Sequence, residues 1–116
     1  MVHTRQLLRS LTPEVCVAPQ LTPGAMAELA TLGFKAVINN RPDFEEGPQQ
    51  PTNAQIEAAA RAAGLEYAYL PVQSAYQSPE EIARMAELLA ALPRPLVAFC
   101  RSGARSTKLY AAASAG

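Results

Sequence analysis

Short apolar segments alternate with amphipathic segments along this chain. Four apolar runs are typical of strands, at residues 15–18, 34–39, 65–72 and 96–99. The segments between them have apolar residues at the three- and four-residue spacing of a helix that buries one face. The pattern therefore predicts strands and helices in alternation.

Helix-start signals support this pattern. Thr22 precedes Pro23, and a threonine cap followed by proline in the first turn is a strong helix start. Thr52 with Gln55, and Ser78 with Glu81, have the spacing of capping boxes. A further helix is expected after Cys100, running through Leu109 and Tyr110.

Helices that connect consecutive short strands imply a mainly parallel sheet. We therefore expect one α/β domain over residues 1–116, with a central sheet of about four to five strands and helices on both faces. Ligands of such sheets bind where the strands end. The segment from Cys100 and the loops 39–43 and 73–77 should meet at that edge.

Composition narrows the choice of partner and compartment. The formal net charge is zero, which argues against nucleic acid or an anionic membrane surface as partner. No apolar run approaches the roughly 20 residues needed to span a bilayer. Cys16 and Cys100 are too few and too far apart for a disulfide framework. A reducing, cytoplasmic setting is expected.

The segment that starts at Cys100 carries the chemistry. It follows a predicted strand, contains glycine, and precedes a predicted helix. Backbone N–H groups of such a loop bind an anion and favour a thiolate, so Cys100 is the predicted nucleophile. Arg105 is predicted to bind the substrate oxyanion through its forked donors. The other predicted substrate-binding residues of this loop are Arg101, Ser102, Gly103, Ala104 and Ser106.

Two residues of the first loop are further candidates. Arg41 could help to bind the anion or could pair with Asp43. Asp43 could be a turn residue or a general acid. No His/Cys/Asp/Glu cluster has metal-ligand spacing, so neither a metal nor a cofactor is predicted.

The cysteine loop resembles the sites of two enzyme classes. Protein tyrosine and dual-specificity phosphatases have five residues between cysteine and arginine, usually with histidine before the cysteine, whereas rhodanese-type sulfurtransferases often have a shorter loop. Here four residues separate Cys100 from Arg105, and Phe99 stands at the histidine position.

Together with residues 39–43, 50–51 and 69–72, the cysteine loop resembles a bacterial family known as DUF442. This family is the phosphatase-like domain of beta-lactamase-hydrolase-like proteins. The resemblance implies a protein tyrosine phosphatase-like fold. Family members occur alone or joined to a persulfide dioxygenase, and they are described both as suggested phosphatases and as sulfurtransferases.

The sequence favours sulfur transfer over phosphoester hydrolysis. Dual-specificity phosphatases carry an acidic aspartate after the strand that corresponds to residues 67–72, and residues 73–77 here contain no acid. Sulfite leaves thiosulfate with little protonation, so a Cys100 persulfide is expected, formed from thiosulfate or a persulfide and passed to a thiol such as glutathione. A persulfide dioxygenase is the protein partner that the resemblance suggests. The alternatives are a phosphatase acting on a phosphoester through a cysteinyl-phosphate, and a non-catalytic anion-binding module.

Overall fold

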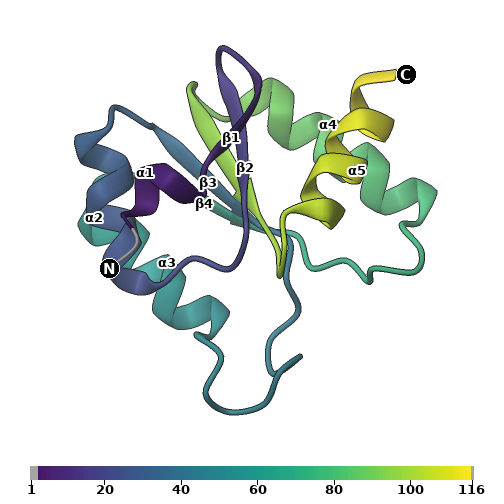
Figure 1. Ribbon diagram of the computed structural model, residues 1–116. Helices are drawn as coiled ribbons and strands as arrows, with labels where there is room; N and C mark the ends of the chain where they lie inside the picture. The colour runs from purple at the N-terminus through teal and green to yellow at the C-terminus, as the bar shows by residue number, and fades with distance from the viewer. Residues whose placement is uncertain (1–2, 116) are drawn as a thin grey trace.

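The computed structural model describes residues 3–115. Its strands are β1 (Arg9–Thr12), β2 (Val15–Ala18), β3 (Ala36–Asn39), β4 (Glu66–Tyr69) and β5 (Leu96–Phe99). Its helices are α1 (Thr4–Leu7), α2 (Pro23–Thr31), α3 (Asn53–Ala62), α4 (Pro79–Ala91) and α5 (Ala104–Ala115). Figure 1 shows them as one twisted sheet between two groups of helices.

The sheet has the strand order β1-β2-β5-β3-β4, and all neighbours except β1 and β2 are parallel. β5 lies at the centre, where Val97 pairs with Cys16 on one side and Val37 on the other. The predicted α/β fold with a mainly parallel sheet is therefore confirmed. The residue that follows β5 consequently emerges in the middle of the carboxyl edge of the sheet.

The observed elements differ from the predicted ones at their ends and near the N-terminus. β3 and β4 are shorter than the apolar runs 34–39 and 65–72. The pattern of apolar and polar residues predicts neither α1 nor β1. Residues 9–12 lack the alternation of a half-buried strand, and they become extended because they pair with β2 through a short hairpin.

Helices cover both faces of the sheet, as expected. Along β5, Val97 and Phe99 face the core beneath α2 and α3, whereas Leu96 and Ala98 face the core beneath α4 and α5. This alternation follows from the two-residue period of a strand, and burial on both faces explains why every residue of β5 is apolar. The three N-terminal helices and the two C-terminal helices lie on opposite sides in Figure 1.

The predicted helix starts are also observed. The Thr22 hydroxyl accepts from the Ala25 N–H. Reciprocal capping boxes join Thr52 with Gln55 and Ser78 with Glu81. Each such cap satisfies one or two N–H groups that the first helical turn leaves without partners. Within residues 3–115, no helix has the length and apolar character needed to cross a membrane.

Candidate active site

Cys100 lies at the carboxyl end of β5, where the sheet holds its backbone. Its N–H donates to the Ala18 carbonyl of β2 at 3.3 Å. Gly103 then turns the chain with a φ of +95°, a conformation that L-residues with a Cβ rarely adopt. This turn brings the Gly103 N–H to 3.1 Å from the Cys100 Sγ. The loop thus folds back over the sulfur.

Several donors surround this sulfur. Among the described residues, the backbone N–H groups of Arg101, Ser102, Arg105 and Ser106 donate to no protein oxygen. Burial raises the pKa of the Cys100 thiol, but hydrogen bonds from Ser106, Gly103 and Ser102 outweigh it, so the net pKa lies below the ordinary value of a cysteine thiol. The loop therefore favours the thiolate, which is the nucleophilic form.

Access to the sulfur is restricted. Cys100 has an exposed fraction of 0%, so a substrate can reach Sγ only after neighbouring groups shift. A cavity of about 840 Å³ lies elsewhere, between α1 and α2. The ring of donors needed for a reactive thiol is present, whereas an open path to it is not.

Ser106 is held by a residue of the first loop. Its hydroxyl donates to the Asn40 Oδ1 at 2.8 Å, and the Asn40 amide donates in turn to the Leu70 carbonyl. A hydroxyl has a single proton, and here Ser106 donates it to Asn40. The backbone N–H of Ser106 is therefore the group that donates to the Cys100 sulfur. Asn40 therefore ties the start of α5 to the ends of β3 and β4.

Arg105 is only 7% exposed, and its donors can be accounted for one by one. Nη1 donates to Glu45 Oε2 at 2.8 Å and to the Val72 carbonyl at 3.1 Å, and Nη2 donates to Glu45 Oε1 at 2.7 Å. A guanidinium has five N–H groups, so Nε–H and the second Nη2–H remain. These two form the side edge of the group, which binds an oxyanion with two parallel hydrogen bonds.

Charge also links Arg105 to the nucleophile. Its pKa lies above the ordinary value, chiefly because of Glu45 and in smaller part because of the Cys100 sulfur. Arg105 also holds the pKa of Glu45 near 2, with help from Arg41 and against the effect of burial. Glu45 is thus ionised at neutral pH and fixes the orientation of Arg105.

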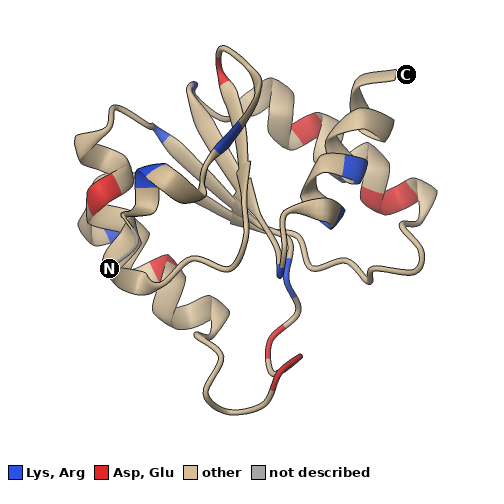
Figure 2. Cartoon of the chain, in the orientation of Figure 1, with Lys and Arg blue, Asp and Glu red and all other residues tan. Residues whose placement is uncertain are grey.

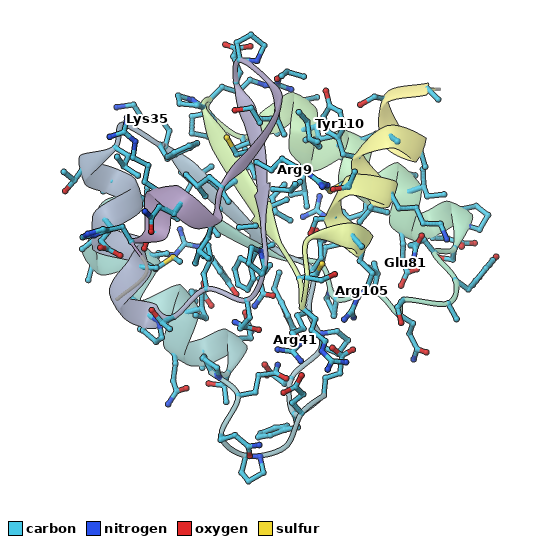
Figure 3. All side chains as sticks on the ribbon, viewed as in Figure 1. Arg9, Lys35, Arg41, Glu81, Arg105 and Tyr110 are labelled. Atoms are coloured by element: carbon cyan, nitrogen blue, oxygen red, sulfur yellow. The ribbon has the colours of Figure 1, made fainter. Side chains whose placement is uncertain are left out.

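The loop after β3, which carries Glu45, also carries a second carboxylate that extends this network of ion pairs. Arg41 Nε donates to Glu45 Oε1 at 2.9 Å, and Arg41 Nη2 lies 3.1 Å from Glu46 Oε1. Glu46 Oε1 is also 2.8 Å from Arg101 Nε. Figure 2 shows the acidic segments of the loop after β3 below the arginines at the strand ends, and Figure 3 shows Arg41 and Arg105 in that same region. Two carboxylates therefore connect three arginines at the carboxyl edge of the sheet.

Asp43 has a different environment. Its Oδ1 accepts from the Asn53 N–H at 2.7 Å, and its own N–H donates to the Tyr69 hydroxyl. Its carboxylate therefore lies at the start of α3, where the helix dipole favours negative charge. Arg41 pairs with Glu45 and Glu46 rather than with Asp43, because Asp43 is directed toward α3.

The structure brings most of the predicted residues together. The loop from Cys100 to Ser106 surrounds the Cys100 sulfur. Glu45 links Arg41 to Arg105 in this loop. Of the two loops expected at this edge, 39–43 contacts α5 directly, and the other reaches the site through the Val72 carbonyl that precedes it. Glu45 and Glu46 were not among the predicted site residues, although two adjacent acids close after the candidate loop 39–43 were the available signal. Within residues 3–115, no group of three or more His, Cys, Asp or Glu side chains could hold a metal ion.

Comparison with known families identifies this type of domain. The family model described as "Beta-lactamase hydrolase-like protein, phosphatase-like domain" matches residues 7–116. The chain belongs to this family. It is a phosphatase-like domain, and its predicted resemblance to DUF442 is confirmed.

Curated relatives of this family are longer than the present chain. A beta-lactamase hydrolase-like protein of Agrobacterium fabrum is 35% identical over 100 residues, which are 86% of this chain and 23% of the relative. A protein of the same name from Xylella fastidiosa is 33% identical over 101 residues, with 87% and 23% coverage. The chain thus spans about a quarter of the length of these relatives.

Solved structures support the same fold. A Neisseria meningitidis protein proposed to be a phosphatase has a TM-score of 0.80 and 31% identity, covering 90% of this chain and 72% of that chain. A DUF442 protein of Shewanella putrefaciens, also proposed to be a phosphatase, has a TM-score of 0.76 and 17% identity, with 90% and 65% coverage. P. aeruginosa TpbA, solved with pTyr, has a TM-score of 0.60 and 17% identity, with 89% and 58% coverage. The protein tyrosine phosphatase-like fold that the resemblance implied is confirmed.

Proposed function

We propose that this domain is a cysteine-dependent phosphatase that hydrolyses phosphoesters. The observation that carries the proposal is the donor arrangement around Cys100, in which backbone N–H groups and the free edge of Arg105 surround one sulfur of lowered pKa. The family description and the Neisseria relative at 31% identity support phosphatase chemistry over the sulfur transfer that the sequence alone favoured.

The proposed reaction has two steps. The Cys100 thiolate attacks phosphorus while the ester P–O bond breaks, and its electron pair leaves with the alcohol oxygen. Water then attacks the cysteinyl-phosphate, the S–P bond breaks, and inorganic phosphate leaves as the thiolate is restored. Arg105 and the loop N–H groups stabilise the charge that develops on the phosphoryl oxygens in both steps.

The leaving group sets a limit on the substrates. Residues 73–77 contain no carboxylic acid, and Glu45 cannot protonate a leaving group at neutral pH because its pKa is about 2. Asp43, directed to the start of α3, is not needed as an acid if the leaving group is already stable as an anion. We therefore expect aryl phosphates to react much faster than alkyl phosphates.

Sulfur transfer remains a second candidate because of the four-residue spacing between Cys100 and Arg105. In that reaction the thiolate attacks the outer sulfur of thiosulfate, the S–S bond breaks, and sulfite leaves with the electron pair. The Cys100 persulfide then passes sulfur to a thiol such as glutathione. A persulfide dioxygenase would be its partner, in a reducing cytoplasm that keeps the cysteine as a thiol.

One experiment separates the two reactions. The protein is given p-nitrophenyl phosphate or thiosulfate, and phosphate release and intact mass are followed. We expect phosphate release that is abolished in Cys100→Ser and retained in the matched control Cys16→Ser. Gain of one sulfur atom at Cys100 without phosphate release would instead establish sulfur transfer. If the wild-type protein catalyses neither reaction, the domain is a non-catalytic anion-binding module.

A further inference from the structure

A second cationic group lies beside the proposed catalytic site. Arg41 is only 4% exposed. Its Nε donates to Glu45 and its Nη1 donates to Gln20 Oε1 at 3.0 Å. Its Nη2 is buried, and among the described residues it has no hydrogen-bond acceptor in suitable geometry. The nearest anion is Glu46 Oε1 at 3.1 Å, an ion-pair contact only.

Leaving such a donor unsatisfied is unusual. A buried polar group without a hydrogen bond destabilises the folded state, and a charged group does so more strongly. Native proteins tolerate this cost where an absent ligand supplies the missing partner. Arg41 therefore has a buried donor that is held by an ion-pair contact and by no hydrogen bond, at the edge of the sheet where substrates of this fold class bind.

Glu46 is a replaceable partner for this donor. Its side chain is 47% exposed, and Arg101, which it also contacts, is 66% exposed. The Glu46–Arg101 contact is an exposed ion pair, and such pairs contribute little to stability. An anionic group that bonds to Arg41 Nη2 and Arg101 Nε together would replace both contacts of the Glu46 carboxylate, which is exposed enough to move into solvent.

The position of this pair relates it to the reacting phosphate. Glu45 Oε1 accepts from both Arg41 and Arg105, so the two guanidinium groups sit on either side of one oxygen. Arg101 directly follows Cys100. A second anion held by Arg41 and Arg101 would thus neighbour a phosphoryl group held by the Cys100 loop and Arg105.

We propose that Arg41 and Arg101 form a second anion subsite and that, beyond simple phosphoesters, the domain preferentially hydrolyses a phosphoanhydride, with its terminal phosphate at Cys100 and the adjoining phosphate between these two arginines. This proposal rests on the proposed phosphatase function. It also explains the lack of an acid on residues 73–77, because a phosphate leaving group needs little protonation and its charge would be stabilised by Arg41 and Arg101.

The bond changes balance without any further reactant than water. The thiolate sulfur bonds to the terminal phosphorus, the P–O bond to the bridging oxygen breaks, and the electron pair remains on the departing phosphate. Water then cleaves the cysteinyl-phosphate, giving inorganic phosphate, a proton and the restored thiolate.

Binding to the Cys100→Ser protein tests the subsite without turnover. Calorimetric titrations compare inorganic pyrophosphate with inorganic phosphate. We expect pyrophosphate to bind at least about tenfold more tightly. Arg101→Ala should remove most of this preference, Glu46→Gln should increase it, and the matched control Arg84→Ala, which alters an exposed Arg84–Glu87 pair elsewhere, should keep it.

The outcomes distinguish this proposal from the proposed function. Equal affinity for the two anions, or a preference that Arg101→Ala leaves intact, would overturn the subsite even if the wild-type protein hydrolyses aryl phosphates. An Arg101-dependent preference for pyrophosphate would support the subsite. If the wild-type protein then hydrolyses neither pyrophosphate nor p-nitrophenyl phosphate, phosphatase function is refuted. Adenosine diphosphate serves as a second ligand, because tighter binding than pyrophosphate indicates an organic diphosphate and weaker binding indicates an inorganic one.

Discussion

Replacing Glu45 by glutamine tests whether this carboxylate holds the site together. The change keeps the shape of the side chain but removes the charge that faces Arg41 and Arg105, which are 4% and 7% exposed. The amide retains one oxygen as an acceptor, while its NH₂ group must face a guanidinium. We expect both folding stability and substrate affinity to fall.

The size of the stability loss follows from the pKa. The pKa of Glu45 falls from 4.5 to about 2 on folding, which corresponds to at most about 3 kcal/mol. Its side chain is 30% exposed, and solvent screening reduces the expected contribution to about 2 kcal/mol. Breaking a fully buried ion pair would cost more, about 3–5 kcal/mol.

The pH dependence has a defined sign. Because folding lowers the pKa of Glu45, its contribution is complete above about pH 4.5 and is lost as the pH falls toward 2. The difference in free energy of unfolding between wild type and Glu45→Gln should therefore shrink between pH 5 and pH 3. Wild-type stability should consequently depend more steeply on pH in this range than that of the variant.

Urea denaturation at pH 7, 5, 4 and 3 measures the stability loss and its pH dependence. The matched control is Glu57→Gln, which removes an exposed pair with Arg61 and should cost less than about 0.5 kcal/mol at every pH. Glu45 does not hold the site together if Glu45→Gln is no less stable than Glu57→Gln at pH 7, or if the stability deficit of Glu45→Gln stays constant down to pH 3.

Three further predictions concern the cysteine loop and its surroundings. In a Cys16→Ser background, alkylation of Cys100 by iodoacetamide should have its pH midpoint below that of free cysteine measured alongside, and an equal or higher midpoint would contradict stabilisation of the thiolate. Gly103→Ala should cost about 1 kcal/mol or more in unfolding free energy and lower kcat, because φ is +95° there; unchanged values of both would show that the turn is not required. Asp43→Asn should leave kcat for aryl phosphates within about twofold, because the amide oxygen can still accept from the Asn53 N–H, and a hundredfold loss would identify Asp43 as the general acid.

The sequence alone determined the parts that depend on local pattern. Local signals predict the strands in the apolar runs, the helix caps at Thr22, Thr52 and Ser78, and the glycine-containing turn after Cys100. They are sufficient because residue propensity, capping and the pattern of apolar and polar residues act over a few neighbouring positions. The alternation of these elements was sufficient to predict a mainly parallel sheet and the edge at which the cysteine loop lies.

Only the tertiary structure decided which charges meet. Glu45 and Arg105 are 60 positions apart in the chain, and nothing in the local pattern ranks Glu45 above Asp43 as the partner of a buried arginine. The direction of Asp43 toward α3, the unsatisfied Nη2 of Arg41, and the burial of Cys100 likewise depend on how three loops pack together at the sheet edge. Long-range electrostatic pairing is set by packing geometry, which a linear pattern of polar and apolar residues does not contain.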